Sequence, residues 1–529
     1  MKPGRSPNPI VRAMMQAVQH HQQGRLDEAE RGYRQVLQKD ARNPDALHLL
    51  GLIEHQRGRC AEAIPLIERA IQIKPGEATF FVNLGQVYKG VNKLDDAERC
   101  ERRAIQLQPK IAEAHAYLAG VLRAKGQLDE AEASVRQALA LNPNLGAAHM
   151  NLGNIVRDRG DSAMALQCFE RSLRLGAPRH EVLTNLGDLL RVMGRWDEAR
   201  AALEEAIRLS PGEAAARWNV SLLYLLTGDL KRGFAEYEWR LKQPGAEGNR
   251  FKQPLWDGSD LNGRTILLHA EQGYGDAIQF VRYAPMVAAR GGRVVLECQA
   301  ALVKLLSAVE GVSECIARGA AASAAFDVQA PLLSLPHIFG TTLETIPARV
   351  PYIKVDDELQ TEWRALVAAP PGVRKIGLVW AGNPAHSNDR NRSIPFSELA
   401  ALSAVPSVKW FSLQIGPAAE QARQGGLELV DLTQKVNDFS DSAALVSALD
   451  LVITVDTSAA HLAGALARPV WVLQPAFPDW RWLLGRSDSV WYPTMRLFRQ
   501  KEAGRWGEVI ADVINALSDP LSLAGRGPG

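Results

Sequence analysis

The sequence is poor in cysteine, in long apolar runs and in net charge. Its five cysteines are scattered and never form a Cys-x-x-Cys pair, which argues against a disulfide framework or structural zinc and favours a reducing compartment. No run of about 18 apolar residues occurs and the N-terminus lacks an apolar leader core, so we expect no membrane-spanning segment and a cytoplasmic location. The net charge of +2 provides no basic footprint for nucleic acid or an anionic membrane.

What the chain does have is length and an uneven composition. With 529 residues, of which 46% are hydrophobic and 23% charged, it is expected to fold into about three to four domains. Of the twelve tryptophans only Trp196, Trp218 and Trp239 precede residue 250. Two different architectures are therefore expected in one chain.

The first half is periodic, with a spacing of 34 residues. A small residue at a fixed offset lets two helices approach closely, and a proline ends each unit. The recurring leucines are Leu50, Leu84, Leu118, Leu152 and Leu186, and the recurring alanines are Ala63, Ala97, Ala131, Ala165 and Ala199.

This period and these offsets resemble the tetratricopeptide repeat. The resemblance covers residues 10–240, or about six to seven repeats, with degenerate terminal units. In that family the sixth position of each unit faces a concave groove, and here it holds Asn83, Asn151, Asn185 and Asn219, with Tyr117 interrupting. Carboxamides there could hold the backbone of a protein or peptide partner, although asparagine is also the ordinary structural residue at this position.

From residue 241 the period gives way to a turn-rich linker, 241–264. Beyond it short apolar runs alternate with helical patterns, which predicts parallel sheets with helices on both faces. The stretch around Pro370 and Pro371 divides this half, so we expect two Rossmann-like domains, 265–367 and 368–518, and a flexible tail, 519–529. The expected strands begin at Thr265, Arg293, Lys375, Lys409, Leu427, Leu451 and Val470.

Several chemistries are excluded by what they require. The turn Gly273-Tyr-Gly275 begins like a dinucleotide fingerprint but lacks the third glycine, and neither a P-loop nor an H-E-x-x-H motif occurs. The histidines of this half are not spaced with carboxylates as metal ligands would be, so no metal and no cofactor is expected.

Two motifs remain that could carry chemistry. A buried strand ends at Asp456, then Thr457 and Ser458 precede a helix of small residues that includes His461, and free amides at a helix N-terminus suit an anion. His461 could instead merely cap or pack. The first strand of this half leads through the glycine turn to Asp276, at the beginning of a helix, where a carboxylate could also serve only as a cap.

Together these motifs resemble the GT-B glycosyltransferases of the heptosyltransferase type, particularly bacterial proteins in which a tetratricopeptide array precedes the catalytic half. The layout is also similar to the O-linked N-acetylglucosamine transferases. The resemblance implies an all-α solenoid followed by an α/β GT-B fold of two Rossmann-like domains. The segments that carry it are 237–240, 271–280, 379–384, 388–393, 455–466, 479–482 and 491–500.

The resemblance also implies roles for individual residues. Asp276 would be the catalytic base, and the diphosphate of a nucleotide-sugar donor would be held by Asp456, Thr457, Ser458 and His461. The lysine expected near the diphosphate has no clear match, so Arg390 or Arg392 would replace it, unless their loop is simply solvated. Gly382 and Gln414, in loops of the second domain, complete the predicted donor site.

The expected function is thus an inverting, metal-independent glycosyltransferase that acts on a protein recruited by the repeats, with a nucleotide-sugar as co-substrate. Two alternatives stay open. The first is a peptide-binding scaffold with a non-catalytic GT-B half, and the second is a glycosyltransferase for a saccharide or lipopolysaccharide-type acceptor.

Overall fold

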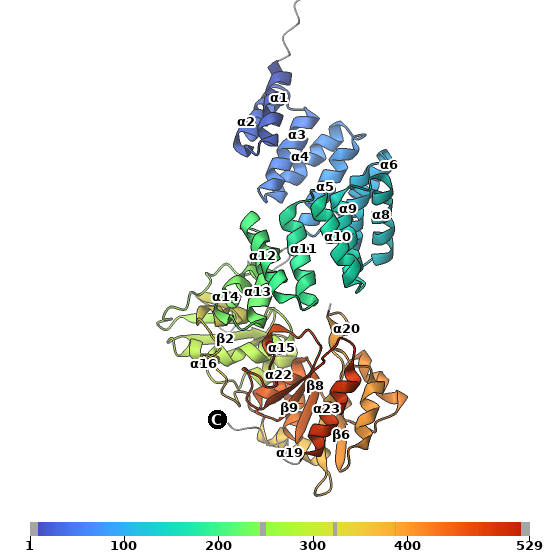
Figure 1. The fold of residues 1–529 in the computed structure, drawn as a ribbon. Helices are drawn as coiled ribbons and strands as arrows, with labels where there is room; N and C mark the ends of the chain where they lie inside the picture. The colour runs from blue at the N-terminus through green and yellow to red at the C-terminus, as the bar shows by residue number, and fades with distance from the viewer. Residues whose placement is uncertain (1–8, 244–249, 321–324, 387, 520–529) are drawn as a thin grey trace, which may run out of the picture. The chain divides into compact units, whose positions relative to one another are not determined.

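The computed structural model describes residues 9–243, 250–320, 325–386 and 388–519. The chain forms two compact units, one running to Asn219 and the other comprising residues 220–241 together with most of the C-terminal half. The first unit is helical and the second contains both sheets (Figure 1).

Consecutive helices of the first unit pack in pairs, α1 on α2, α3 on α4 and onward (Figure 1). The recurring alanines, Ala63 and its equivalents at 34-residue spacing, are 0% exposed because they lie where paired helices meet. A Cβ added to Gly51 would lie 2.6 Å from Ile67, so the glycine permits the same close approach. The prediction of an α-solenoid is confirmed here. Its helices are α1 (Pro9–Gln22), α2 (Leu26–Lys39), α3 (Pro44–Gln56), α4 (Cys60–Ile73), α5 (Ala78–Gly90), α6 (Leu94–Leu107), α7 (Ala112–Ala124), α8 (Leu128–Leu141), α9 (Gly146–Asp158), α10 (Ser162–Arg174), α11 (Arg179–Val192), α12 (Trp196–Leu209) and α13 (Ala214–Leu226).

One core position of the repeat carries a carboxylic acid. Four residues after each recurring alanine the side chain is buried, and in neighbouring repeats it is Ile67, Val135 or Phe169, whereas α6 has Glu101. Glu101 is 0% exposed, and within the described residues its Oε2 has no hydrogen-bond partner. Burial raises the pKa of Glu101 well above its usual value, although Gln86 donates to its Oε1.

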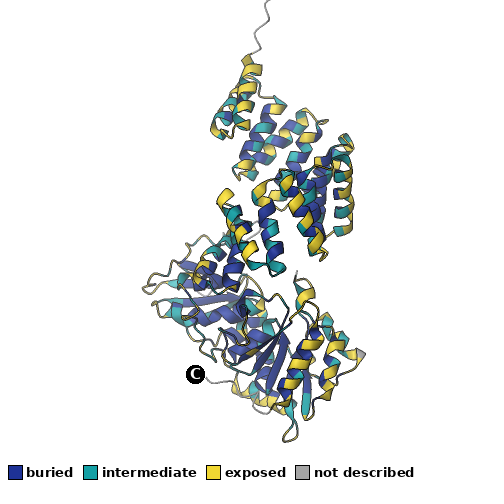
Figure 2. Ribbon diagram, viewed as in Figure 1, coloured by how far each residue is buried: buried dark blue, intermediate teal, exposed yellow. Residues whose placement is uncertain are grey.

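The second unit contains two parallel sheets, as the alternating strand and helix patterns predict (Figure 1). Most of their strands are buried and appear dark blue in Figure 2, whereas the edge strands β3 and β7 are only partly buried. The first sheet has the order β3-β2-β1-β4 and the second β10-β9-β8-β5-β6-β7. The strands are β1 (Thr265–His269), β2 (Arg293–Cys298), β3 (Glu314–Ala317), β4 (Val328–Pro331), β5 (Arg374–Val379), β6 (Val408–Ser412), β7 (Val430–Asp431), β8 (Leu451–Val455), β9 (Val470–Gln474) and β10 (Met495–Arg499).

The boundary between the compact units lies between Asn219 and Val220, before the expected end of the repeats at residue 240. Helix α14 (Leu230–Tyr237) belongs to the second unit, where the rings of Phe234 and Tyr237 lie 5.6 and 6.2 Å from that of Trp480. Part of the expected linker 241–264 also packs there, because the Trp256 amide donates to the Gln329 carbonyl. Residues 244–249 of that linker lie outside the described residues.

The later boundaries also differ in detail. Helix α19 (Asp357–Leu366), which the sequence assigns to the first Rossmann-like domain, packs against α21 (Phe439–Ser447), which precedes β8 of the second sheet. The second sheet is followed by α23 (Trp506–Ser518). Of the expected flexible tail 519–529, residues 520–529 lie outside the described part of the chain.

Candidate functional site

The two motifs meet in space although 185 residues separate Asp276 from His461. Helix α15 (Tyr274–Phe280) follows β1, and α22 (Ser458–Ala465) follows β8. A Cβ added to Gly275 would lie 2.8 Å from Cδ2 of His461 and 3.6 Å from Cα of Ser458. The glycine therefore lets the N-terminal turns of the two helices approach closely.

Asp276 occupies the third position of α15, and both of its carboxylate oxygens are engaged. Gly273 caps the helix, and its backbone amide donates to Oδ2 of Asp276 over 2.9 Å. The other oxygen, Oδ1, accepts a hydrogen bond from Nη2 of Arg481. Asp276 thus fulfils the expected capping role and also takes part in an ion pair.

Arg481 is the principal residue of this site to which the sequence analysis assigns no role. Its side chain is only 9% exposed and also donates to Asp479 Oδ1 over 2.9 Å and to Gln279 Oε1 over 2.7 Å. The guanidinium carbon lies 4.2 Å from the ring centroid of Trp480. The segment Asp479-Trp-Arg-Trp belongs to the family resemblance, which is the one signal that could have pointed to this residue.

Two carboxylates, those of Asp276 and Asp479, accept hydrogen bonds from this guanidinium, and its charge also acts on Asp456. Burial raises the pKa of Asp276, while Arg481 lowers it and Asp479 raises it. Burial and then Asp479 raise the pKa of Asp456 to about 6, against the opposing effects of Arg392 and Arg481. Of these groups, the carboxyl of Asp456 can therefore exchange a proton at mildly acidic pH.

His461 is neutral in this environment. It is 5% exposed, and burial, followed by Arg481 and Arg282, lowers its pKa well below the usual value. Its Nδ1 lies 3.0 Å from the hydroxyl of Tyr492, and its ring stacks on Trp482. His461 can thus act as a neutral hydrogen-bonding group.

The start of α22 is lined by small residues. Thr457 precedes the helix, but among the described residues its side chain makes no capping bond, since its hydroxyl pairs with that of Thr454 at 3.1 Å. Ser458, the first helical residue, is partly exposed. The first amides of α22 are therefore not capped by the Thr457 side chain.

Arg392 and Gly382 lie together beside Asp456. Nη1 of Arg392 donates to the backbone oxygen of Asp456 over 3.0 Å, and its Nε pairs with Asp389 at 3.2 Å. A Cβ added to Gly382 would come within 2.5 Å of Nη2 of Arg392, so the glycine makes room for this arginine. Arg390, on the same short helix α20 (Asp389–Arg392), is exposed.

Gln414 is a structural residue of the second sheet. Its Oε1 accepts from the amides of Trp380 and Ala381, and its Nε2 donates to the carbonyls of Ala381 and Ile415. These four bonds use the whole hydrogen-bonding capacity of the Gln414 side chain. Gln414 therefore holds the loop after β5 and has no group left for the predicted nucleotide-sugar.

A buried ion pair joins the segment Tyr237–Arg240 to the loop that precedes the glycine turn. Arg240 is 5% exposed, and its Nε and Nη2 donate to the two oxygens of Glu271 over 3.1 and 2.8 Å. Nη2 also donates to Ser334. The pair anchors the loop that leads to Gly273 and Asp276.

The asparagines of the repeats are not equivalent. Asn151 is 7% exposed and donates to the Ala116 carbonyl over 2.7 Å, while Asn83 pairs with His48 at 2.8 Å. Asn185 donates to the Glu181 carbonyl one turn earlier on its own helix, and Asn219 is partly exposed. The four asparagines therefore do not form a continuous ladder of free carboxamides, because three of them already have hydrogen-bond partners.

A second periodic series, of cationic side chains, runs through the repeats and has no counterpart among the predicted site residues. Lys89, Arg123, Arg157 and Arg191 are each 34 residues apart and lie near the ends of α5, α7, α9 and α11. Arg123 pairs with Asp158 at 2.7 Å, whereas Arg157 and Arg191 pair with Asp188 at 3.3 and 2.8 Å. The 34-residue spacing of these cationic residues is the feature of the sequence from which the series can be recognised.

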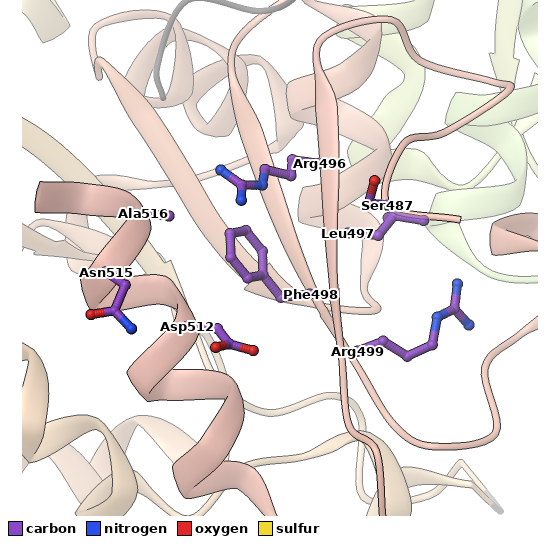
Figure 3. Close-up of a pocket in the computed structure, with 8 residues that line it drawn as sticks. All are labelled: Ser487, Arg496, Leu497, Phe498, Arg499, Asp512, Asn515 and Ala516. Carbon is purple, nitrogen blue, oxygen red and sulfur yellow. The ribbon is translucent and has the colours of Figure 1, made fainter. Parts of the chain in front are cut away.

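A separate pocket lies between β10 and α23 (Figure 3). The predicted site residues are absent from the eight described residues that line it, which are Ser487, Arg496, Leu497, Phe498, Arg499, Asp512, Asn515 and Ala516. Elsewhere in the described ranges, no cluster of three or more potential metal ligands occurs. No described helix is long and apolar enough to cross a membrane.

Comparison with known proteins identifies the N-terminal region. The tetratricopeptide repeat family matches residues 14–78, 82–145, 121–180 and 184–243. This region therefore contains tetratricopeptide repeats, a class of repeat that typically binds protein partners. The chain is also similar to protein FlbA of Caulobacter vibrioides, with 28% identity over 340 residues, or 59% of this chain. It spans about half of that relative's length, because 56% of FlbA is covered.

Solved structures similar to part of the chain include a tetratricopeptide repeat protein from Parabacteroides merdae and pilF from Pseudomonas aeruginosa. The first is 17% identical, covers 43% of this chain and 91% of its own, and has a TM-score of 0.36. The second is 19% identical, covers 39% of this chain and 95% of its own, and has a TM-score of 0.32.

Proposed function

We propose that the chain is a cytoplasmic, inverting and metal-independent glycosyltransferase of the GT-B type. It would transfer a sugar from a nucleotide-sugar donor to a hydroxyl group of a protein that the repeats recruit. The observation that carries this proposal is the meeting of Asp276 with the N-terminal turn of α22, where Gly275 lies against His461. A carboxylate and an anion-binding helix terminus at the ends of two parallel sheets supply the two groups that such a transfer needs.

The proposed reaction uses residues of both sheets. Asp276 would accept the proton of the acceptor hydroxyl as its oxygen attacks the anomeric carbon, and the bond from that carbon to the diphosphate would break. The amides of α22 and a neutral His461 would donate hydrogen bonds to the departing diphosphate. Arg392 and Arg481, which lower the pKa of Asp456, would supply positive charge. A single in-line displacement inverts the anomeric centre.

The test compares Asp276→Asn with a control at another helix start. We expect Asp276→Asn to reduce turnover at least about 100-fold, because a general base typically contributes that much, and to leave nucleotide affinity within about twofold. Asp438 caps α21 through the amides of Ser440 and Asp441, so Asp438→Asn controls for the loss of a capping carboxylate.

The measurements are release of nucleoside diphosphate from uridine, guanosine, cytidine and adenosine sugar donors, and calorimetric binding of the corresponding diphosphates. Normal turnover by Asp276→Asn would show that the base is another residue. Absence of binding to every nucleotide would favour a scaffold protein. Transfer to a saccharide but to no protein would move the acceptor to the carbohydrate class.

A further inference from the structure

Arg481 links the loops of the two sheets at the candidate base. It follows β9 of the second sheet, whereas Asp276 lies on α15, which follows β1 of the first. Its Nη2 donates to Oδ1 of Asp276, and its Nε donates to Gln279 one turn further along the same helix. A residue of one sheet thus determines the surroundings of the candidate base on the other.

The guanidinium is rigidly held. Asp479 orients Nη1 and, through the same oxygen, also accepts from the backbone amide of Arg481 at 3.0 Å. The ring of Trp480 covers the guanidinium carbon. Because Nε and Nη1 are held by Gln279 and Asp479, the direction in which Nη2 donates to Asp276 is fixed.

We propose that Arg481 is a positioning residue for the transfer reaction, which keeps the carboxylate of Asp276 ionised and in a single orientation. This inference rests on the proposed function and names a residue on which that function depends. Since the two residues belong to different sheets, the base is competent only while both α/β halves are assembled around it.

The charges around Asp276 explain why the guanidinium is needed. Burial is the main influence that raises the pKa of this carboxyl, and Asp479 raises it further. Arg481 is the strongest opposing influence, followed by the Gly273 amide and His386. Without Arg481, the carboxyl of Asp276 would face a second carboxylate with no guanidinium to oppose it, and its pKa would rise further.

Orientation depends on the same contact. The Gly273 amide holds Oδ2 and Arg481 holds Oδ1, so the plane of the carboxylate is defined from both sides. If Arg481 were lost, only the capping bond would remain, and the side chain could rotate about it.

Two substitutions with opposite expected effects test the inference. In Arg481→Gln the acid limb of the pH dependence of kcat/KM should move up by at least about one pH unit, because an opposite charge in contact typically shifts a carboxyl by one to three. In Asp479→Asn the limb should move down, because a charge that raises the pKa of Asp276 has been removed. Arg481→Lys, which keeps the charge but loses the fork, should lie between wild type and Arg481→Gln. If Arg481 had a purely structural role, its substitution would lower the maximum of kcat/KM and leave the pH of the acid limb unchanged.

A second measurement is independent of activity. The titration of Asp276 can be followed by carbon-13 NMR of aspartate-labelled full-length protein, with the resonance assigned by its loss in Asp276→Asn. An equal pKa of Asp276 in wild type and Arg481→Lys or Arg481→Gln overturns the inference, whether or not the chain has activity. If the pKa shifts as expected but the wild type turns over no donor, the proposed function fails and the positioning role with it, and only the ion pair remains.

Discussion

Gly275 and the imidazole of His461 lie so close that no side chain can stand between them. An added Cβ would be 2.8 Å from Cδ2 of a ring that is 5% exposed and stacked on Trp482. The ring has little room to withdraw, and therefore the contact fixes the distance between α15 and α22.

Gly275→Ala is accordingly expected to weaken both stability and turnover. Alanine suits a helix better than glycine, so any loss reports the clash and not backbone strain. We expect a fall in the free energy of unfolding of about 1–3 kcal/mol, measured by denaturant unfolding, and a fall in kcat/KM. Gly273→Ala is the matched control, because its Cβ would meet only Asp276 Oδ2 at 3.4 Å. Unchanged stability in Gly275→Ala would contradict the close approach of the two helices.

Replacing Glu101 by an apolar residue is expected to stabilise the repeats. Glu101→Leu removes a buried oxygen without a described partner and restores the residue type that Ile67 and Val135 supply in neighbouring repeats. At neutral pH the gain should be about 1–3 kcal/mol. The reciprocal change Val135→Glu, one repeat later, should be strongly destabilising.

The gain from Glu101→Leu should depend on pH in a defined direction. The folded state holds a proton on Glu101 above the usual pKa of 4.5, so the folded wild type binds more protons than the unfolded chain. Its stability therefore falls as the pH rises above 4.5, whereas the variant lacks this term. The midpoints of thermal unfolding of the two proteins, measured from about pH 4 to 7, should differ more as the pH rises, with the variant the more stable. A difference that does not change with pH would contradict the raised pKa of Glu101.

Asp188 is expected to stabilise the repeats more than an exposed carboxylate does. Burial raises its pKa, but Arg191 and Arg157 outweigh burial, so the pKa of Asp188 lies below its usual value of 3.8. Its contribution is present above that value and is lost as the pH falls further. Asp188→Asn should lower the midpoint of thermal unfolding at pH 7, and the difference should narrow below about pH 4. The control is Asp129→Asn, where the side chain is 98% exposed and its pairing with Arg159 should contribute little.

Arg240→Ala is expected to destabilise the C-terminal unit strongly. The change would leave Glu271, which is 11% exposed, without the guanidinium that now contacts both of its oxygens. Breaking a buried pair in this way typically costs about 3–5 kcal/mol. Arg240→Lys should lose less, because a charge remains. Hydrogen exchange at the amides of β1 and α15 measures the effect locally, and unchanged protection there would contradict the anchoring role.

The repeats were predictable from sequence because each unit repeats the same contact. Ala63 and its equivalents meet the same neighbours every 34 residues, so periodicity alone identifies the packing surface. The use of Asn151 was not predictable, because its amide turns toward the Ala116 carbonyl in the preceding repeat. That choice depends on side-chain rotation, which the period does not encode.

At the candidate site, sequence reasoning found the local motifs and missed the long-range partners. Asp276 and His461 lie on the helices that follow two strands predicted from apolar runs, whereas Arg481 contacts Asp276 across 205 residues of sequence. Strand β4 was missed for a related reason. It carries Gln329, which is 3% exposed and bonds to His269 at 2.8 Å, so a polar residue interrupts the apolar run.

The short segment from Pro254 to Trp256 has a consequence for dissecting the chain. It exchanges backbone hydrogen bonds with Gln329 of β4, the last strand of the first sheet, through the Pro254 carbonyl and the Trp256 amide. The segment thereby pairs the backbone amide and carbonyl of Gln329 at an edge of the sheet, groups that would otherwise be open to another strand. A truncation that began at Thr265, where the strands begin, would uncover this edge and should aggregate. One that began at Ala214, the first residue of α13, would keep the edge covered and also retain Phe234, Tyr237 and Arg240, so we expect a separable C-terminal half to include the last helices of the array.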